Sequence, residues 1–290
     1  MKKSRKLATL GICSALFLGL AACKQQYATS EGTNQKQSSS AKVPWKASYT
    51  NLNNQVSTEE VKSLLSAHLD PNSVDAFFNL VNDYNTIVGS TGLSGDFTSF
   101  THTEYDVEKI SHLWNQKKGD FVGTNCRINS YCLLKNSVTI PKLEKNDQLL
   151  FLDNDAIDKG KVFDSQDKEE FDILFSRVPT EATTDVKVHA EKMETFFSQF
   201  QFNEKARMLS VVLHDNLDGE YLFVGHVGVL VPADDGFLFV EKLTFEEPYQ
   251  AIKFASKEDC YKYLGTKYAD YTGEGLAKPF IMDNDKWVKL

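Results

Sequence analysis

The apolar residues of this chain follow two different periods. Before residue 200 they recur every three or four positions, the spacing of one helix face, and after residue 206 they alternate or run continuously, as in strands. This pattern predicts helices at 57–69, 72–88, 106–115, 126–135, 165–178 and 185–200, strands at 206–215, 220–231, 236–243 and 249–255, and a closing helix at 257–269 with one or two short strands after it. Helices that precede an antiparallel meander indicate the α+β class, in a single domain from residue 43 to residue 290.

Turn residues separate the first three expected strands. The segments "NLDG" at 216–219 and "PADDG" at 232–236 are rich in Asn, Asp and Gly, which predicts hairpins. With "PADD" as a four-residue loop, Val231 faces Gly236. The acidic segment 151–158, "FLDNDAID", lacks the glycine and final glutamate of a calcium-binding loop, and we interpret it as a turn.

Residues 1–22 have the composition of a secretion signal. A basic head precedes an apolar stretch, residues 7–22, that is too short for an ordinary membrane span. The stretch leads into Leu-Ala-Ala-Cys, which resembles the lipobox of bacterial lipoproteins, where the cysteine is acylated and becomes the mature N-terminus. The resemblance implies a lipid anchor on Cys23 at the extracellular face of the cell membrane. The alternative is an ordinary signal peptide cleaved at an Ala-x-Ala-like site, with Cys23 incidental.

Residues 23–42 are expected to tether the folded part to this anchor. After Cys23 they are mostly Gln, Ser, Thr and Lys with a single aromatic residue, Tyr27, so they bury too little apolar surface to fold and are expected to be disordered. Loss of the signal leaves 32 − 4 = 28 basic residues against 40 acidic residues. A net charge near −12 with no basic stripe gives no reason to expect a nucleic-acid partner.

Three cysteines remain in the folded part, an odd number that leaves at least one thiol free unless two chains pair. No Cys-x-x-Cys and no spaced Cys/His pair is present, so we expect no metal and no cofactor. Cys132 follows Ile128 by four residues on the expected buried face and reads as a core residue, and nothing distinguishes Cys260. Cys126 differs because Asn125 is a preferred N-cap residue. The N–H groups and dipole of a first helical turn favour a thiolate there.

His226 stands in an otherwise apolar strand, "YLFVGHVGVLV". Strict alternation places Leu222, Val224, His226, Gly228 and Leu230 on one face. Both faces are apolar, which predicts a central strand and a buried imidazole, and such a ring is costly to bury unless its nitrogens find partners. Glycines in a strand interior, as at 225 and 228, indicate the close approach of a ligand or another backbone.

Glu241 on the next strand is the expected partner of His226. If Val231 faces Gly236, five steps back on one strand and five forward on the other place the two side chains directly opposite, with Cβ atoms about 4.5–5.5 Å apart. A carboxylate there fixes the tautomer of the ring and stabilises its cation, whereas a slip of one residue turns it to the other face. Gln250, in "EPYQ", is a further candidate for the third member of the site or for a substrate contact.

A thiol at a helix start, a histidine in a central strand and a polar residue on the next strand resemble, in this order, the papain-like fold and its NlpC-type cell-wall peptidases. Asn125-Cys126 is similar to their Asp-Cys, and "HVGV" at 226–229 to their histidine segment, although Arg127-Ile128 replaces the usual Ser-Gly. The segments "GTNCRINSY", "GHVGVLVPADDGFLFVEKLTFEEPYQAIKF" and "KPFIMDND" also resemble streptococcal lipoproteins grouped as domain of unknown function 4300. This resemblance implies a Gram-positive surface lipoprotein.

Two functions are compatible with these residues. The first is a thiol hydrolase or acyltransferase acting on an amide of the cell wall or of a surface peptide, with Cys126 as nucleophile, His226 as general base and acid, and Glu241 as orienting group. Asn125 or the backbone N–H of Cys126 then holds the oxyanion. The second is a non-catalytic lipoprotein that binds a peptide or glycan on a papain-like scaffold. In that case Asn125 only caps, His226 is a satisfied core residue, and Glu241 pairs with Lys242.

Overall fold

The computed structural model describes residues 45–290, and the predicted signal peptide, the predicted lipid anchor at Cys23 and the predicted tether lie outside the described residues. The helices are α1 (Gln55–Ser66), α2 (Pro71–Val88), α3 (Val107–Lys118), α4 (Cys126–Leu134), α5 (Phe151–Gly160), α6 (Ser165–Leu174), α7 (Val186–Phe197) and α8 (Lys257–Lys267). The strands are β1 (Ala47–Thr50), β2 (Thr98–Ser99), β3 (Val138–Thr139), β4 (Val178–Pro179), β5 (Gln201–Phe202), β6 (Arg207–Asp215), β7 (Tyr221–Ala233), β8 (Gly236–Lys242), β9 (Tyr249–Phe254), β10 (Phe280–Asp283) and β11 (Lys286–Val288).

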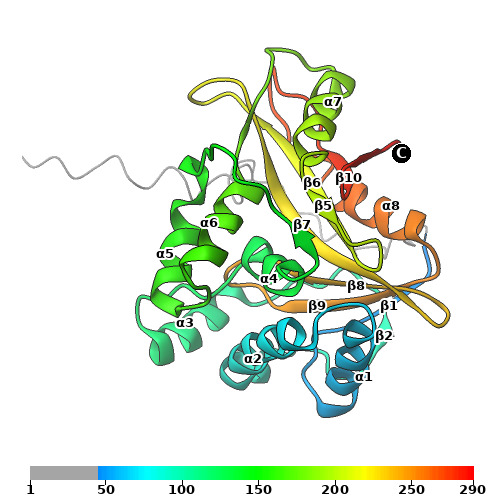
Figure 1. Ribbon diagram of the computed structural model, residues 1–290. Coiled ribbons are helices and arrows are strands. Elements are labelled where there is room, and N and C mark those ends of the chain that lie inside the picture. Colours follow the sequence, from blue (N-terminus) through cyan, green and yellow to red (C-terminus); the bar gives the residue numbers. More distant parts are fainter. Residues whose placement is uncertain (1–44) are drawn as a thin grey trace, which may run out of the picture. The chain divides into compact units, whose positions relative to one another are not determined.

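One antiparallel sheet organises this part of the chain. Its strand order is β11-β10-β6-β7-β8-β9-β1-β2, with β4 paired to β7, and β3 and β5 form a separate small ladder. The meander β6–β9 stands at its centre and follows seven of the helices in sequence (Figure 1). The predicted α+β class, with a helical part before the sheet, is therefore confirmed.

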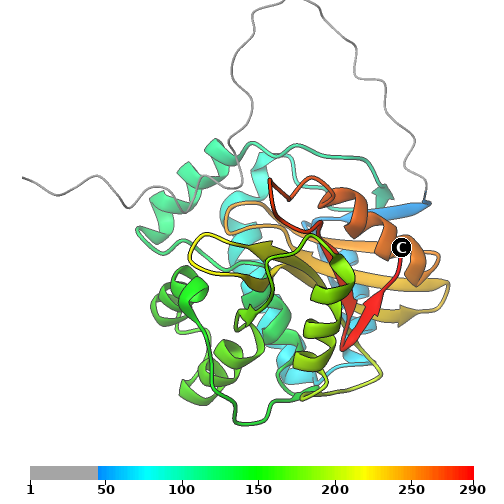
Figure 2. The ribbon, with the colours of Figure 1, turned by 90° about the horizontal axis from the view of Figure 1, so that it is seen from above.

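Helices cover the two faces of the sheet. One apolar cluster joins α2, α4, α6 and α7 to β7 through residues such as Val227 and Val229, and a second joins α8 to the opposite face through residues such as Leu230 and Phe239. Figure 2 shows the sheet running between α8 and the pair α5–α6. The central strands are therefore buried on both sides, as their continuous apolar sequence predicts.

Two predicted boundaries and one predicted turn are wrong. The helix at 165–178 ends at Leu174, because β4 turns away to pair with β7, and the helix expected to start at residue 57 starts at Gln55, where Asn54 caps it. The acidic segment 151–158 is not a turn but lies in α5. Asp153, Ala156 and Ile157 form the buried face of α5, so its apolar stripe is interrupted by a carboxylate that Arg127 neutralises.

A bulge in β7 changes which residues share the face of His226. Val211 pairs with His226 and Val212 with Val224, so Gly225 is the extra residue. The bulge shifts the alternation, and Val224 and Leu222 pack in the cluster on the α4 face instead of sharing a face with Leu230, as strict alternation predicted.

The β7–β8 hairpin is tighter than predicted. Ala233 pairs with Gly236, so only two residues form the turn and the expected four-residue loop is wrong. The register moves by two positions, which keeps Glu241 on its predicted face but places it one step beyond the Val229–Val240 pair, diagonal to His226. Gly228 marks a close backbone approach as expected, since a Cβ there would lie 2.8 Å from the carbonyl oxygen of Val240.

Candidate active site

The ladder between β7 and β8 stops before it reaches His226. Its last pair is Val229–Val240, and beyond this point two side chains of α4 occupy the edge of β7. Arg127 and Ser130 donate hydrogen bonds to β7 carbonyl oxygens at 3.0 and 3.2 Å. The first turns of α4 therefore lie against an opening in the sheet, between the two strands that carry the predicted histidine and glutamate.

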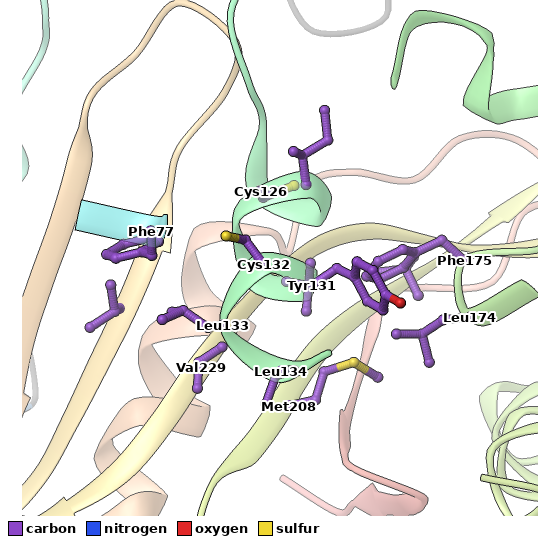
Figure 3. Packing of buried hydrophobic residues seen from close by; sticks show 14 of the residues in the cluster. Phe77, Cys126, Tyr131, Cys132, Leu133, Leu134, Leu174, Phe175, Met208 and Val229 are labelled. Carbon is purple, nitrogen blue, oxygen red and sulfur yellow. The ribbon is translucent and has the colours of Figure 1, made fainter. Parts of the chain in front are cut away.

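Cys126 is the first residue of α4, as the sequence predicted. The side chain of Asn125 caps the helix, with Oδ1 accepting from the backbone N–H of Ile128 at 3.1 Å. Cys126 is 6% exposed, and its interaction with the His226 ring lowers the pKa of its thiol. Figure 3 shows Cys126 at the start of α4 and Cys132 farther along, among the packed apolar side chains. The opening in the sheet thus brings together a thiol and an imidazole from segments 100 residues apart.

The imidazole of His226 lies between a carboxylate and a thiol. Its Nε2 donates to Oε2 of Glu241 at 2.5 Å, and the ring also interacts with the thiol of Cys126. The ring stacks on Tyr268, with centroids 4.9 Å apart and planes 24° from parallel. These contacts fix both the tautomer and the orientation of the ring.

Glu241 is fully buried and is held by α8 from the other side. Tyr263 donates its hydroxyl to Oε1 at 2.5 Å, and the Lys267 ammonium lies 3.4 Å from the same oxygen. The sequence reasoning missed Tyr263, Lys267 and Tyr268. The available signal was the run "YKYLGTKYADY", residues 261–271, because tyrosines there take the inward positions where a plain core helix has aliphatic residues.

The electrostatics of the site favour the ion-paired form. Burial by itself raises the pKa of the Cys126 thiol, but the charge and hydrogen bond of His226, with help from Arg127, bring that pKa below its ordinary value. Burial likewise lowers the pKa of His226, yet the Cys126 thiolate and the Glu241 carboxylate together raise it above the ordinary value. For Glu241, Lys267 and His226 overcome burial and lower the pKa to about 2. The two shifts at the thiol and the ring agree in favouring thiolate and imidazolium.

A second buried ion pair supports the start of α4. Asp153 on α5 accepts from Nε and Nη2 of Arg127 at 2.9 and 2.7 Å, and from the side-chain amide of Asn125 at 2.7 Å. The amide of Asn125 is therefore engaged with Asp153 and its oxygen with the helix cap. The backbone N–H of Cys126 lies in the first turn, where such groups have no acceptor within the helix.

Gln250 lies beside the site in the sheet. It pairs with Glu241 in the β8–β9 ladder, and its amide donates to the hydroxyl of Tyr105 at 2.8 Å. That hydroxyl also accepts from Asn51 at 2.9 Å, and burial raises the pKa of Tyr105 to about 12. Gln250 thus belongs to a neighbouring hydrogen-bond network on the strand next to Glu241.

Lys242 does not pair with Glu241 at a sheet edge. The two residues are neighbours on one strand, so their side chains point to opposite faces. The Lys242 ammonium instead donates to the carbonyl oxygens of Thr244, Phe245 and Glu247 in the loop that follows. Burial lowers the pKa of Lys242 to about 7.

The other two described cysteines are core residues. Cys132 is buried, and burial raises its pKa to about 12; Cys260 is also buried, with a pKa well above the ordinary value. Among residues 45–290, no cluster of three or more His, Cys, Asp or Glu side chains is placed to hold a metal ion. Of the three thiols, Cys126 has the lowered pKa and the imidazole partner.

A family model described as a domain of unknown function (DUF4300) matches residues 48–288. The chain belongs to this family. The match includes every candidate residue from Cys126 to Gln250, so the DUF4300 region contains the whole thiol site. No curated protein and no solved structure matches the chain. Within the described part of this DUF4300 protein, no helix has the length and apolar character needed to cross a membrane.

Proposed function

We propose that this protein is a thiol hydrolase or acyltransferase in which Cys126 is the nucleophile, His226 the general base and acid, and Glu241 the group that orients the ring. The observation that carries the proposal is the interaction of the Cys126 thiol with the His226 ring, whose Nε2 in turn donates to a buried carboxylate. A core histidine needs its nitrogens satisfied, but it does not need a thiolate as one of the partners. An activated nucleophile held by a base that is itself oriented is the arrangement required for covalent catalysis.

The proposed reaction begins with the thiolate. Sγ attacks an amide carbonyl, the C–S bond forms, and the developing oxyanion is bound by the backbone N–H of Cys126 at the helix start. His226 then gives its proton to the leaving amine as the C–N bond breaks, which leaves a thioester. Water, or an amine in an acyltransferase, attacks the thioester while His226 takes its proton, and loss of the acyl product restores thiolate and imidazolium.

The resemblance of these sequence segments to papain-like peptidases supports this assignment of roles. The thiol at the start of a helix, the histidine on a central strand and the carboxylate on the next strand occur in the order of the NlpC-type peptidases. The lipobox-like sequence that ends at Cys23 supports a location of the site at the extracellular face of a Gram-positive cell membrane. An amide of the cell wall or of a surface peptide is then the substrate within reach.

The test is the rate of alkylation of each cysteine by iodoacetamide against pH, with the modified residue assigned by mass spectrometry. Cys126 is expected to react with an apparent pKa well below the free value of about 8.5, because burial is outweighed by His226. His226→Ala is expected to raise that pKa, with folding checked by circular dichroism. Cys132→Ser serves as the matched control and leaves the Cys126 profile unchanged. If Cys126 in the folded protein titrates like a free cysteine, the catalytic proposal is wrong.

One observation favours the alternative, a non-catalytic peptide- or glycan-binding lipoprotein. Only 6% of the surface of Cys126 is exposed, so a substrate carbonyl reaches the thiol only if the surrounding segments yield. If the protein binds without catalysis, cell-wall fragments bind equally well to the wild type and to Cys126→Ala, and no thioester adduct forms. A covalent adduct on Cys126, detected as a mass increase after acid quenching, separates the enzyme from the binding protein.

A further inference from the structure

A cavity of about 160 Å³ lies beside the segment that leads into the candidate nucleophile. It is formed between α2, α3 and the loop after β8, and most of its wall is apolar or aromatic. The apolar and aromatic part of the wall is Tyr84, Ile110, Trp114, Val122 and Phe245, and the polar part is Ser111, Asn115 and Glu246. None of these residues has a role in the thiol chemistry described above, so the cavity needs a separate explanation.

The cavity adjoins the backbone that positions Cys126. Val122 is followed by Gly123, whose φ is +90°, and then by the cap of α4. A Cβ at Gly123 would lie 3.3 Å from the Trp114 ring and 3.6 Å from the Phe245 carbonyl oxygen, so this backbone packs directly on two wall residues. The cavity and the thiol are therefore separated by a few residues of one ordered segment.

Two anchors fix the part of the wall that the loop after β8 forms. The buried ammonium of Lys242 donates to three carbonyl oxygens of the loop 244–247, and Tyr84 donates its hydroxyl to the carbonyl oxygen of Glu246 at 2.5 Å. Lys242 follows Glu241 directly. One strand thus orients the imidazole with one side chain and holds the cavity wall with the next.

The size and charge of the cavity select a neutral apolar occupant. A dry cavity of about 150 Å³ lined by apolar side chains accepts a benzene ring, so about 160 Å³ suits one aromatic or large aliphatic side chain. Lys118, which lies 5.6 Å from the Trp114 ring centroid, is already paired with Asp83 at 2.7 Å, and Glu246 is the charged residue of the cavity wall. The Glu246 carboxylate repels an anion, and the apolar part of the wall does not compensate a cation for its lost hydration.

We propose that this cavity is a specificity subsite that takes an aromatic or large aliphatic side chain adjacent to the amide attacked by Cys126. The link to cleavage rests on the proposed function, whereas the selection of an apolar side chain rests on the cavity itself. The substrate class is thus narrowed to peptides that carry such a residue next to the scissile bond.

The experiment compares labelling of Cys126 by chloromethyl ketones of N-acetylated phenylalanine, alanine, lysine and glutamate, with iodoacetamide measured alongside. The phenylalanine reagent is expected to react at least about tenfold faster than the alanine reagent, since one well-fitted apolar group gives that order of discrimination. Ser111→Phe, which fills the cavity from α3, is expected to remove this preference. Lys109→Phe, an exposed position on the same helix, is the matched control and retains it.

The outcomes separate the two proposals. Equal rates for phenylalanine and alanine, or a preference for lysine or glutamate, with normal iodoacetamide labelling overturn the subsite and leave the thiol chemistry standing. If iodoacetamide does not label Cys126, the proposed function fails. Ligand binding in the cavity is then tested separately, by the fluorescence of Trp114 in the Cys126→Ala variant. A saturable change with N-acetylphenylalanine amide but not with the alanine amide, absent in Trp114→Phe, supports an apolar ligand site; no saturable change overturns it.

Discussion

Glu241→Gln tests whether the buried carboxylate stabilises the cation of His226. The substitution keeps the shape of the side chain but removes its charge at a position with 1% exposure. In the wild type each carboxylate oxygen accepts a 2.5 Å hydrogen bond, one from His226 and one from Tyr263. The amide retains one acceptor oxygen, which can face His226, but its nitrogen must face Tyr263, whose hydroxyl already accepts from Lys267 at 2.8 Å.

The size of the effect follows from the pKa of Glu241. Burial raises this pKa, but Lys267, His226 and Tyr263 lower it from 4.5 to about 2 in the folded protein. At about 1.4 kcal/mol per pH unit, the difference corresponds to roughly 3 kcal/mol of folding stability. Because the folded pKa is depressed, this contribution is present above about pH 4.5 and is lost as the pH falls through about 2. Removal of one partner from a buried ion pair costs about 3–5 kcal/mol in other proteins. The roughly 3 kcal/mol expected for Glu241→Gln lies at the lower end of that range.

The assay is urea unfolding of wild type and Glu241→Gln between pH 2 and 8. We expect a difference of roughly 3 kcal/mol at pH 7 that narrows below about pH 4.5. Glu220→Gln is the matched control, since Glu220 also accepts from a histidine, His214, at 2.7 Å but its side chain is 30% exposed, and we expect about 1 kcal/mol or less. Equal stability of wild type and Glu241→Gln across this range would refute the reasoning.

The same variant tests the link from carboxylate to thiol. With a neutral amide at 241 the His226 cation loses its charge-assisted hydrogen bond, so the pKa of His226 falls and the pKa of Cys126 rises. Because Glu241 acts on the thiol only through the ring, the alkylation profile is expected to move by roughly one pH unit, less than in His226→Ala. A larger shift in Glu241→Gln than in His226→Ala contradicts this order.

Two further predictions concern the support of α4 and the anchor. Asp153→Ala leaves the Arg127 guanidinium, 15% exposed, without its ion-pair partner and is expected to lower the free energy of unfolding by roughly 3–5 kcal/mol in urea, whereas Asp158→Ala, whose side chain is 64% exposed, changes it by less than about 1 kcal/mol. A similar cost for both contradicts a buried ion pair. Cys23→Ser is expected to leave the protein unprocessed or released from membranes; complete partition into detergent means that Cys23 is not the anchor.

Local patterns were enough to locate most helices, the meander and the first turn that carries Cys126. The N-cap at Asn125 is a local interaction between a side chain and the backbone three residues later, so the sequence around it determines it. The burial of His226 and the α+β order also follow from apolar periodicity along single segments. Periodicity failed at α5, where Asp153 occupies the buried face because Arg127, from another helix, neutralises it.

Contacts between distant segments were decided only by the tertiary structure. Counting residues placed Glu241 on the correct face, but the two-residue turn determines its diagonal position relative to His226. Tyr263 reaches Glu241 from α8, on the face of the sheet opposite α4, and no sequence spacing encodes that meeting. The sequence suggested Lys242 as a partner for Glu241, yet the loop after β8 folds back and gives its ammonium three carbonyl acceptors. Local propensity fixes how a segment folds, whereas the charge state of a buried side chain depends on whichever elements pack around it.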